Sequence, residues 1–376
     1  MKKFSSHQNK ISILIGLAIG IFLLNFFLPD KKSGIIFKEL TPVRDNRIAM
    51  GQEDGKQRHC SDLRDLKSCT ESYKNTSNKM PVILWLGNSQ LHTILQLKPD
   101  DEVSSLQLHR KLKPFGKYTL TLSQPNANLQ EHYLLFAHLL NQFPIETLIL
   151  PVFFDDMRED MLRSDIKNIL DNPHTLESIE KTFTGKNLIS LFDEKDTVGN
   201  QSKIEKNTPQ NNWEDYLNRE LANIWPLWSE RDNLRRNFFG QLHQLRNLAL
   251  GITATTTRKM IKGPYIKNQR AYEDMLSLAL KNKIKLLVYI PPLRNDVKIP
   301  YNLNEYKNFK KKIKDIADKY NANFVSLENI IPREFWGSKG STSFKKDPEL
   351  DFMHFKGDGH RILAESLFIE IRKIIE

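Results

Sequence analysis

The sequence predicts an α/β protein built on a doubly wound, flavodoxin-like, mainly parallel sheet of five strands. From residue 80 onward, short apolar runs alternate with amphipathic stretches of helical length. This alternation is typical of parallel strands joined by right-handed helical crossovers. An uncharged apolar segment near the N-terminus stands outside the pattern and predicts one separate helix. The α/β domain is therefore expected to cover residues 80–376.

Five apolar runs are predicted as strands because they are short, continuous and bounded by turn residues. They cover residues 81–87, 117–122, 145–154, 282–292 and 321–327. A long interruption at about residues 160–265 is polar and loop-like in its first part and rich in Trp and Phe in its second. We predict a helical insertion whose aromatic residues pack on the main core. The alternative is a cap over a site, or a face resting on a membrane or a partner.

The N-terminus predicts a membrane anchor. Residues 11–28 contain no charged side chain, and as a helix they would span about 27 Å, which matches a hydrocarbon core. Three lysines precede the segment, so the positive-inside rule places residues 1–10 in the cytoplasm. No A-x-A cleavage pattern follows, which favours an uncleaved anchor with the remaining chain extracytoplasmic. A buried core helix is the alternative.

The polar segment at residues 29–79 is predicted to be an extracytoplasmic stalk. It holds both cysteines of the chain, Cys60 and Cys69. In an oxidising compartment a disulfide that closes this short loop is the simplest interpretation. A two-ligand metal site without C-x-x-C spacing would be a poor one, and two unrelated thiols remain an alternative. No metal and no cofactor is expected.

The formal net charge of +11 concerns partners rather than fold. Nucleic acid is one class of partner for such a charge, but neither a helix-turn-helix nor a zinc-finger pattern is visible. We therefore expect no nucleic acid. An anionic lipid surface or an anionic envelope polymer fits the predicted anchor better.

Two motifs suggest a catalytic site. Ser89 follows the first strand in "LWLGNSQLH", and Asp351 and His354 form D-x-x-H after the last strand and before the final helix. The carboxyl ends of parallel strands meet at one sheet edge, so residues 262 positions apart (351 − 89) would come together. An aspartate can orient an imidazole that takes a proton from a serine. The alternative is an ordinary turn at Ser89 and a helix cap at Asp351.

These motifs resemble the SGNH (GDSL-like) hydrolase superfamily. "LGNSQ" is similar to its first block, normally Gly-Asp-Ser, and "DFMHFKGDGHRILAE" is similar to its last block. The resemblance covers about residues 80–376, interrupted by the insertion. It implies Ser89 as nucleophile, His354 as general base and acid, and Asp351 as the partner that orients His354.

The remaining blocks depart from the family pattern. Asn88 replaces the usual aspartate, and its amide could brace the turn. Asn126 stands where a glycine normally offers its backbone N–H to the oxyanion, and asparagine tolerates left-handed backbone. Asp155 and Asp156 stand where an asparagine side chain is normal, and a carboxylate there would repel an oxyanion. Asn128 is an alternative donor.

The loosened blocks are similar to those of membrane-anchored members that act on cell-surface polymers, such as D-alanyl transfer proteins and polysaccharide O-acetyltransferases. The resemblance implies an extracytoplasmic serine acyl-transfer enzyme, an esterase or an O-acyltransferase, acting on an acylated envelope glycan or polymer. A membrane protein that donates the acyl group is a further expected partner. Two alternatives stay open: a catalytically inactive binding or assembly module, and a transmembrane scaffold whose aromatic helices recruit a partner.

Overall fold

The computed structural model divides the chain into two compact units. One comprises residues 42–200, 254–339 and 348–376, and the other residues 1–41, 201–253 and 340–347. The structure describes residues 51–61, 63–76, 80–198, 220, 241–242, 244–342 and 348–376. The predicted anchor at residues 11–28 and the aromatic part of the insertion around Trp213–Phe239 lie outside the described residues. Within the described ranges, no helix has the length and apolar character needed to cross a membrane.

The first of these units is built on a six-stranded sheet in the order β3-β5-β4-β6-β7-β8, with every neighbouring pair parallel. Its strands are β3 (His59–Cys60), β4 (Val82–Gly87), β5 (Tyr118–Ser123), β6 (Ile145–Pro151), β7 (Lys285–Ile290) and β8 (Asn323–Ser326). The five predicted strands are confirmed, and the predicted count of five is corrected to six because β3 pairs with β5 at the sheet edge. Without β3, their order is the flavodoxin-like 2-1-3-4-5, so the doubly wound prediction is also confirmed.

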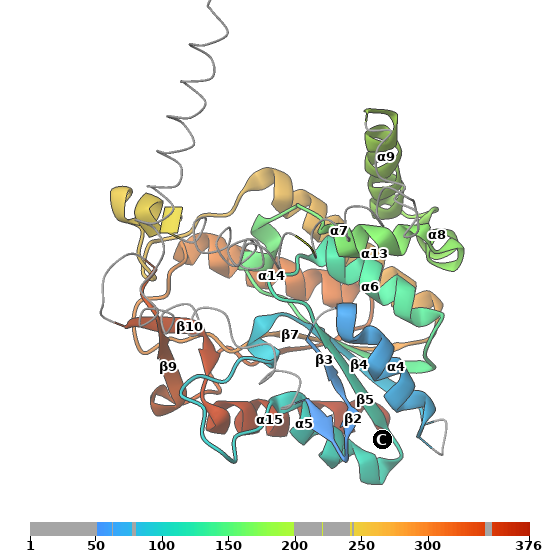
Figure 1. Cartoon of the computed structure of the whole chain (residues 1–376), viewed down its shortest axis with the longest axis horizontal. Helices are drawn as coiled ribbons and strands as arrows, with labels where there is room; N and C mark the ends of the chain where they lie inside the picture. Colours follow the sequence, from blue (N-terminus) through green and yellow to red (C-terminus); the bar gives the residue numbers. More distant parts are fainter. Residues whose placement is uncertain are drawn as a thin grey trace, which may run out of the picture. The chain divides into compact units, whose positions relative to one another are not determined.

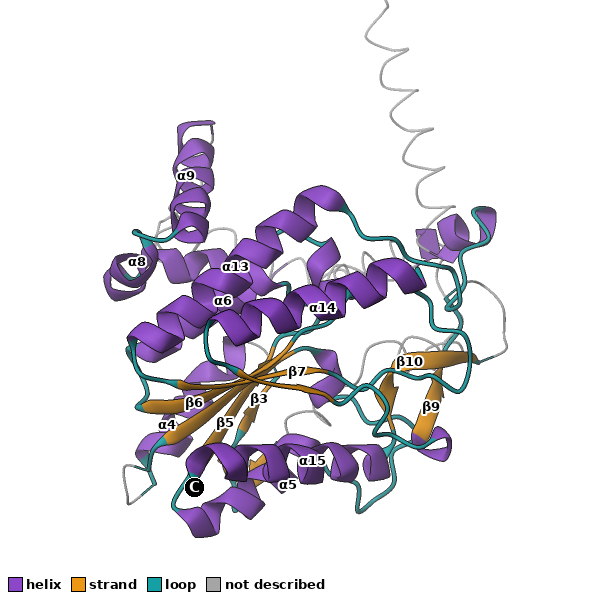
Figure 2. Cartoon of the chain, turned by 180° about the vertical axis from the view of Figure 1, so that it is seen from behind, coloured by secondary structure: helices purple, strands orange, loops and turns teal. Residues whose placement is uncertain are grey.

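Helices cover both faces of the sheet (Figures 1 and 2). The two on one face are α5 (Ser104–Leu112) and α15 (Gly357–Ile375); those on the other are α4 (Leu66–Lys74), α6 (Leu129–Leu140), α13 (Lys262–Lys281) and α14 (Leu303–Lys319). Strand β4 has buried side chains on both sides, since Leu84 packs into the core of the α6 face and Trp85 into that of the α15 face. Burial on both faces explains its continuous apolar run.

The first part of the insertion is helical, which corrects the prediction of a loop. It forms α7 (Ser164–Lys167), α8 (Pro173–Ile179) and α9 (Phe183–Val198). Asn172 caps α8 through a hydrogen bond from the N–H of Thr175, and Ile179 and Leu188 are buried in the main core. Contacts with the main core through Ile179 and Leu188 stabilise α8 and α9.

Two antiparallel ribbons complete the described elements. One pairs β1 (Gln52–Glu53) with β2 (Lys56–Gln57), and the other pairs β9 (Trp336–Lys339) with β10 (Glu349–Phe355). Strand β10 carries the D-x-x-H motif and leads directly into α15.

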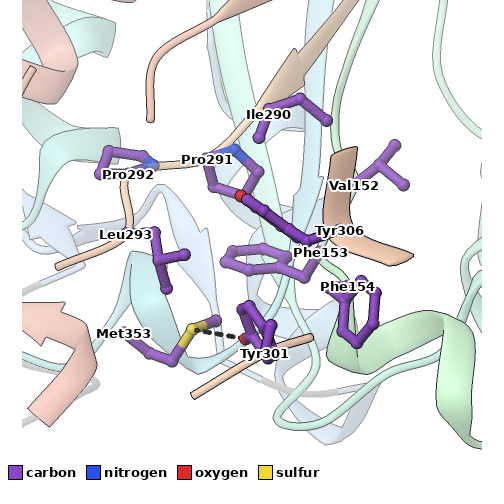
Figure 3. Close-up of a pocket in the computed structure, with 10 residues that line it drawn as sticks. All are labelled: Val152, Phe153, Phe154, Ile290, Pro291, Pro292, Leu293, Tyr301, Tyr306 and Met353. Carbon is purple, nitrogen blue, oxygen red and sulfur yellow. Dashed lines mark hydrogen bonds between the residues drawn. The ribbon is translucent and has the colours of Figure 1, made fainter. Parts of the chain in front are cut away.

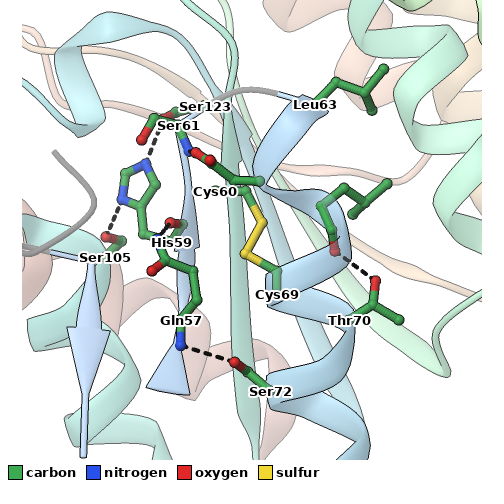
Figure 4. Close-up of a disulfide and its surroundings, with 12 residues drawn as sticks. Gln57, His59, Cys60, Ser61, Leu63, Cys69, Thr70, Ser72, Ser105 and Ser123 are labelled. Carbon is green, nitrogen blue, oxygen red and sulfur yellow. Dashed lines mark hydrogen bonds between the residues drawn. A yellow bond between two sulfur atoms is a disulfide. The ribbon is translucent and has the colours of Figure 1, made fainter. Parts of the chain in front are cut away.

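Residues 51–76 belong to the folded domain, which corrects the predicted extent of the stalk. Strand β3 pairs with β5 at the sheet edge, and α4 packs against the same core. The predicted Cys60–Cys69 disulfide is confirmed, and both cysteines are buried (Figure 4). It joins β3 to α4, next to the hydrogen bond from the N–H of Gln57 to Ser72 Oγ. A strand of two residues has no detectable periodicity, so β3 could not be predicted from its sequence pattern.

Removing the disulfide is expected to destabilise the domain. The bond closes a loop with a sequence separation of 9, for which the loss of unfolded-state entropy contributes about 2–3 kcal/mol. The double variant Cys60→Ser, Cys69→Ser should therefore lose about that much free energy of unfolding in guanidinium denaturation. Dithiothreitol should lower the midpoint of the wild type and leave that of the double variant unchanged. Equal midpoints for the two proteins would contradict the prediction.

Candidate active site

Ser89 is presented by a tight turn at the carboxyl end of β4. The turn is a single 3₁₀ turn, η2 (Ser89–Leu91), and Asn88 caps it by accepting a hydrogen bond from the N–H of Gln90 at 3.0 Å. Asn88 therefore braces the turn as predicted. A Cβ at Gly87 would lie 2.2 Å from Cδ1 of Leu91, so any larger residue there would force that side chain to shift.

Ser89, His354 and Asp351 form a continuous hydrogen-bonded chain. Ser89 Oγ lies 2.9 Å from His354 Nε2, and His354 Nδ1 lies 3.0 Å from Asp351 Oδ2. Because a carboxylate can only accept, His354 donates through Nδ1, which leaves Nε2 to accept the serine hydroxyl proton. The three predicted residues are thus brought together with the polarity that nucleophile activation needs.

The backbone around β10 fixes this alignment. Asp351 Oδ1 accepts hydrogen bonds from the N–H groups of Met353 and His354 at 2.8 and 2.9 Å. The chain that follows the serine turn runs beside the end of β10, where the N–H of Leu95 donates to the carbonyl of Phe355 at 3.0 Å. Both segments are therefore positioned by main-chain contacts.

Asp351 is ionised in spite of its burial. The residue is 3% exposed, and burial on its own would raise the pKa of its carboxyl. The charge and hydrogen bond of His354, the charge of Lys339 and the N–H of Met353 outweigh this effect and hold the pKa well below its usual value. An ionised Asp351 stabilises the imidazolium that forms when His354 takes a proton.

Gln90 is a site residue that the sequence reasoning missed. It is fully buried, and its Nε2 donates to the carbonyls of Pro292 at 2.9 Å and Met353 at 2.6 Å. One amide thereby joins the serine turn to the loop after β7 and to β10. A long neutral amide directly after the candidate nucleophile was the only sequence signal for this role.

Asn126 adopts the left-handed backbone conformation that the prediction required, with φ of +51°. Gly87 pairs with Ser123 at the ends of β4 and β5, so Ser89 and Asn126 follow neighbouring strand ends. Among the described residues, no acceptor bonds to the backbone N–H of either residue. The role of these N–H groups as oxyanion donors stays a prediction.

Asn128 is occupied elsewhere. Its Oδ1 accepts from the N–H of Glu131 at 3.1 Å, and its Nδ2 donates to the carbonyl of Met161 at 2.9 Å. Together with the side chain of Glu131 this forms a capping box at the start of α6. The N-x-x-E spacing is a known signature of such a cap, so Asn128 serves the helix cap, and its role as an oxyanion donor stays a prediction.

Asp155 is held in an ion-pair cluster. Its Oδ1 accepts from Arg158 at 3.1 Å, and its Oδ2 accepts from Arg258 and from the hydroxyl of Tyr301, the latter at 2.9 Å. Two guanidinium groups therefore compensate its charge. Both of its oxygens are engaged as acceptors, so the side chain does not supply the amide donor of the third block.

Asp156 is buried in a different environment from its neighbour. Its Oδ1 lies 3.4 Å from Nδ2 of Asn88, and its Oδ2 has no hydrogen-bond partner within the described part of the chain. Burial, reinforced by the charge of Asp155, raises the pKa of Asp156 well above its usual value. The raised pKa favours the neutral form of Asp156, and the two arginines pair with the carboxylate of Asp155.

Two other histidines near the turn have structural partners. His92 Nδ1 lies 2.7 Å from Ser123 Oγ. His360 accepts from the N–H of Ser104 and donates to the carbonyl of Thr93, both at 3.1 Å, and burial lowers its pKa to about 4. Neither histidine has a recorded bond to Ser89, whereas His354 does.

No protein-family model and no curated protein matches the chain. Among solved structures it is similar to a proposed acylhydrolase from Bacteroides fragilis, at 10% identity and a TM-score of 0.36, over 84% of this chain and 99% of that one. A proposed GDSL-like lipase from Parabacteroides merdae matches at 10% identity and a TM-score of 0.36, over 78% and 95%. An active-site mutant of a family two carbohydrate esterase from Clostridium thermocellum matches at 10% identity and a TM-score of 0.29, over 78% and 63%. These likenesses are too distant to assign a function to this chain.

The neutral state of Asp156 predicts a pH-dependent effect of Asp156→Asn. In the unfolded chain the carboxyl ionises around its ordinary pKa of 3.8, whereas burial keeps it protonated in the folded protein. The folded wild type therefore loses stability as pH rises above about 4, and an asparagine has no such loss. The melting temperature of Asp156→Asn minus that of the wild type should increase from pH 4.5 to pH 8.

Asp100→Asn serves as the control, because Asp100 is exposed. The difference in melting temperature between Asp100→Asn and the wild type should not widen over the same range of pH. A constant difference for Asp156→Asn would mean that Asp156 is ionised in the folded protein.

Proposed function

We propose that the protein is a serine acyl-transfer enzyme that acts on an ester. The observation that supports this most directly is the hydrogen-bonded chain from Ser89 through His354 to the ionised Asp351. A serine hydroxyl is a weak nucleophile, and an adjacent oriented base activates it. This arrangement fits a reaction at a carbonyl carbon.

The reaction proceeds in two steps. Ser89 Oγ attacks the ester carbonyl and passes its proton to His354 Nε2. When the tetrahedral intermediate collapses, the ester C–O bond breaks and the leaving alkoxide takes that proton, so the acyl group stays on Ser89. Water or a glycan hydroxyl then attacks the acyl-enzyme by the same route, which gives an esterase or an O-acyltransferase.

The negative charge that develops on the carbonyl oxygen needs donors. The backbone N–H groups of Ser89 and Asn126 are the candidates, since both residues follow neighbouring strand ends. Removal of one such donor typically costs about 10²–10³-fold in rate. The asparagine donor of the third block has no counterpart at Asp155, which favours slow turnover or a strongly preferred substrate.

The site of action is proposed to be the cell envelope. The uncharged segment at residues 11–28 and the net charge of +11 support a single-pass anchor, an extracytoplasmic domain and an acylated envelope glycan or polymer as substrate. A membrane protein could supply the activated acyl group. The second candidate function is a binding or assembly module without turnover, which the ion-paired Asp155 favours.

Covalent labelling tests the proposal. The full-length protein should react with a fluorophosphonate probe at Ser89, and Ser89→Ala should abolish the reaction. Loss of the general base in His354→Ala, or of correct orientation in Asp351→Asn, should slow labelling by about 10²–10⁴-fold. In-gel fluorescence over time gives the rates.

Ser178→Ala is the matched control, since Ser178 is a partly exposed serine whose hydroxyl donates to the carbonyl of His174 in its own helix. Its labelling rate should equal that of the wild type. A folded wild type that stays unlabelled, with a known serine hydrolase labelled in the same tube, would favour the binding module.

A further inference from the structure

An apolar pocket lies at the carboxyl ends of β6 and β7 (Figure 3). Its empty space is about 210 Å³, open mouth included. All of its lining side chains are aliphatic, aromatic or proline, and the largest are Phe153, Phe154, Leu293, Tyr301, Tyr306 and Met353. The lining carries no charged side chain.

The pocket and the candidate nucleophile share the same backbone supports. Met353 directly precedes His354, and the carbonyls of Met353 and Pro292 both accept from the amide of Gln90, the residue after Ser89. Two lining residues are thus one hydrogen bond away from the serine turn. Of the parts of a bound ester, the acyl group attached to the reacting carbonyl is the one nearest to this pocket.

The wall of the pocket is rigid. Tyr301 donates to Asp155 at 2.9 Å, its ring stacks on Tyr306 with centroids 5.2 Å apart, and it packs at a tilt against Phe154 with centroids 4.6 Å apart. The side chains of Arg158 and Arg258 hold Asp155 in turn. An aromatic cluster fixed in this way resists enlargement, because close-packed interiors yield little to an added methylene.

We propose that this pocket binds the acyl chain of the substrate and selects a short, uncharged acyl group. The inference rests on the proposed function. The 210 Å³ includes the open mouth, and nearly all of the lining side chains are buried, so the enclosed part has room only for a short group. A charged aminoacyl group is disfavoured because no carboxylate lines the pocket, and the carboxylate of Asp155 behind it is already ion-paired.

The inference gives Asp155 a role other than that of an oxyanion donor. By accepting the hydroxyl proton of Tyr301, its carboxylate fixes the ring that closes one side of the pocket. Asp155 is therefore a positioning residue for chain-length selection.

The test compares kcat/KM of the full-length protein, in detergent, on 4-nitrophenyl acetate, butyrate and octanoate. The wild type should prefer acetate and butyrate over octanoate by at least about 10-fold, since each methylene that does not fit costs about 10-fold or more. The 3-aminopropionyl ester has as many heavy atoms in its acyl chain as butyrate but ends in an ammonium. It should react at least about 10-fold more slowly than butyrate.

Variants that enlarge the pocket should move this preference. Leu293→Ala, and the milder Val152→Ala in case the first does not fold, should lower the butyrate-to-octanoate ratio by about 5-fold or more. Leu367→Ala is the matched control, because Leu367 is equally buried but packs from α15 into the other core. Its ratio should stay at the wild-type value.

The outcomes separate the two proposals. Labelling of Ser89 together with equal turnover of acetate and octanoate, or with an unchanged ratio in folded Leu293→Ala and Val152→Ala, would overturn the pocket assignment alone. Equal rates for butyrate and the 3-aminopropionyl ester would overturn the exclusion of charged groups. Absence of both labelling and turnover would overturn the proposed function and the pocket assignment with it.

Discussion

The side-chain amide of Gln90 is the interaction on which the geometry of the site depends. In the serine turn, Gln90 donates to the carbonyl of Pro292 in the loop after β7 and to that of Met353 in β10. Each acceptor lies more than 200 positions further along the chain. Buried carbonyls must find a donor, and leaving one unsatisfied costs about 1–3 kcal/mol. The requirement fixes the three segments to one another. Ser89 and His354 then follow as the residues directly beside two of these contact points.

The three acidic residues of the site differ because their surroundings differ. Asp351 is buried but accepts from two N–H groups and from His354, which hold its pKa well below the usual value. Asp155 is ion-paired with Arg158 and Arg258. Asp156 has Asn88 as a donor but is buried and faces the charge of Asp155, so its pKa is raised well above the usual value. Burial disfavours the charged form of both Asp351 and Asp156, and the specific neighbours of each decide the outcome.

The sequence was sufficient for those features that follow from topology. Parallel strands end at one edge, so a serine after the first strand and D-x-x-H before the last helix had to meet, and Ser89 and His354 are 2.9 Å apart. Topology does not specify the local use of a side chain. Asn128 was an alternative donor although its spacing to Glu131 also signals a cap; its Oδ1 accepts within that cap, and its Nδ2 donates to the carbonyl of Met161.

Strand β3 and the role of Gln90 were not predicted, for a related reason. Two residues are too few for a periodic pattern, and β3 forms because β5 offers an unpaired edge and the Cys60–Cys69 bond ties it to α4. Gln90 is polar in a turn of polar residues, and only the positions of two distant carbonyls distinguish it. Long-range partners, which determine both cases, are not visible in a local stretch of sequence.

Asp155 shows how a change at one position can alter another property of the site. A carboxylate where an asparagine donor is normal weakens the stabilisation of an oxyanion. The same carboxylate accepts from Tyr301, and an asparagine in its place would lose the charge that attracts Arg158 and Arg258. Charge-assisted hydrogen bonds are stronger than neutral ones, so the carboxylate holds the aromatic wall more firmly than an amide would. If the pocket binds the acyl chain, an aspartate rather than an asparagine at position 155 gives up part of the oxyanion stabilisation. In exchange it holds the pocket wall more rigidly, which sharpens the selection of the acyl group.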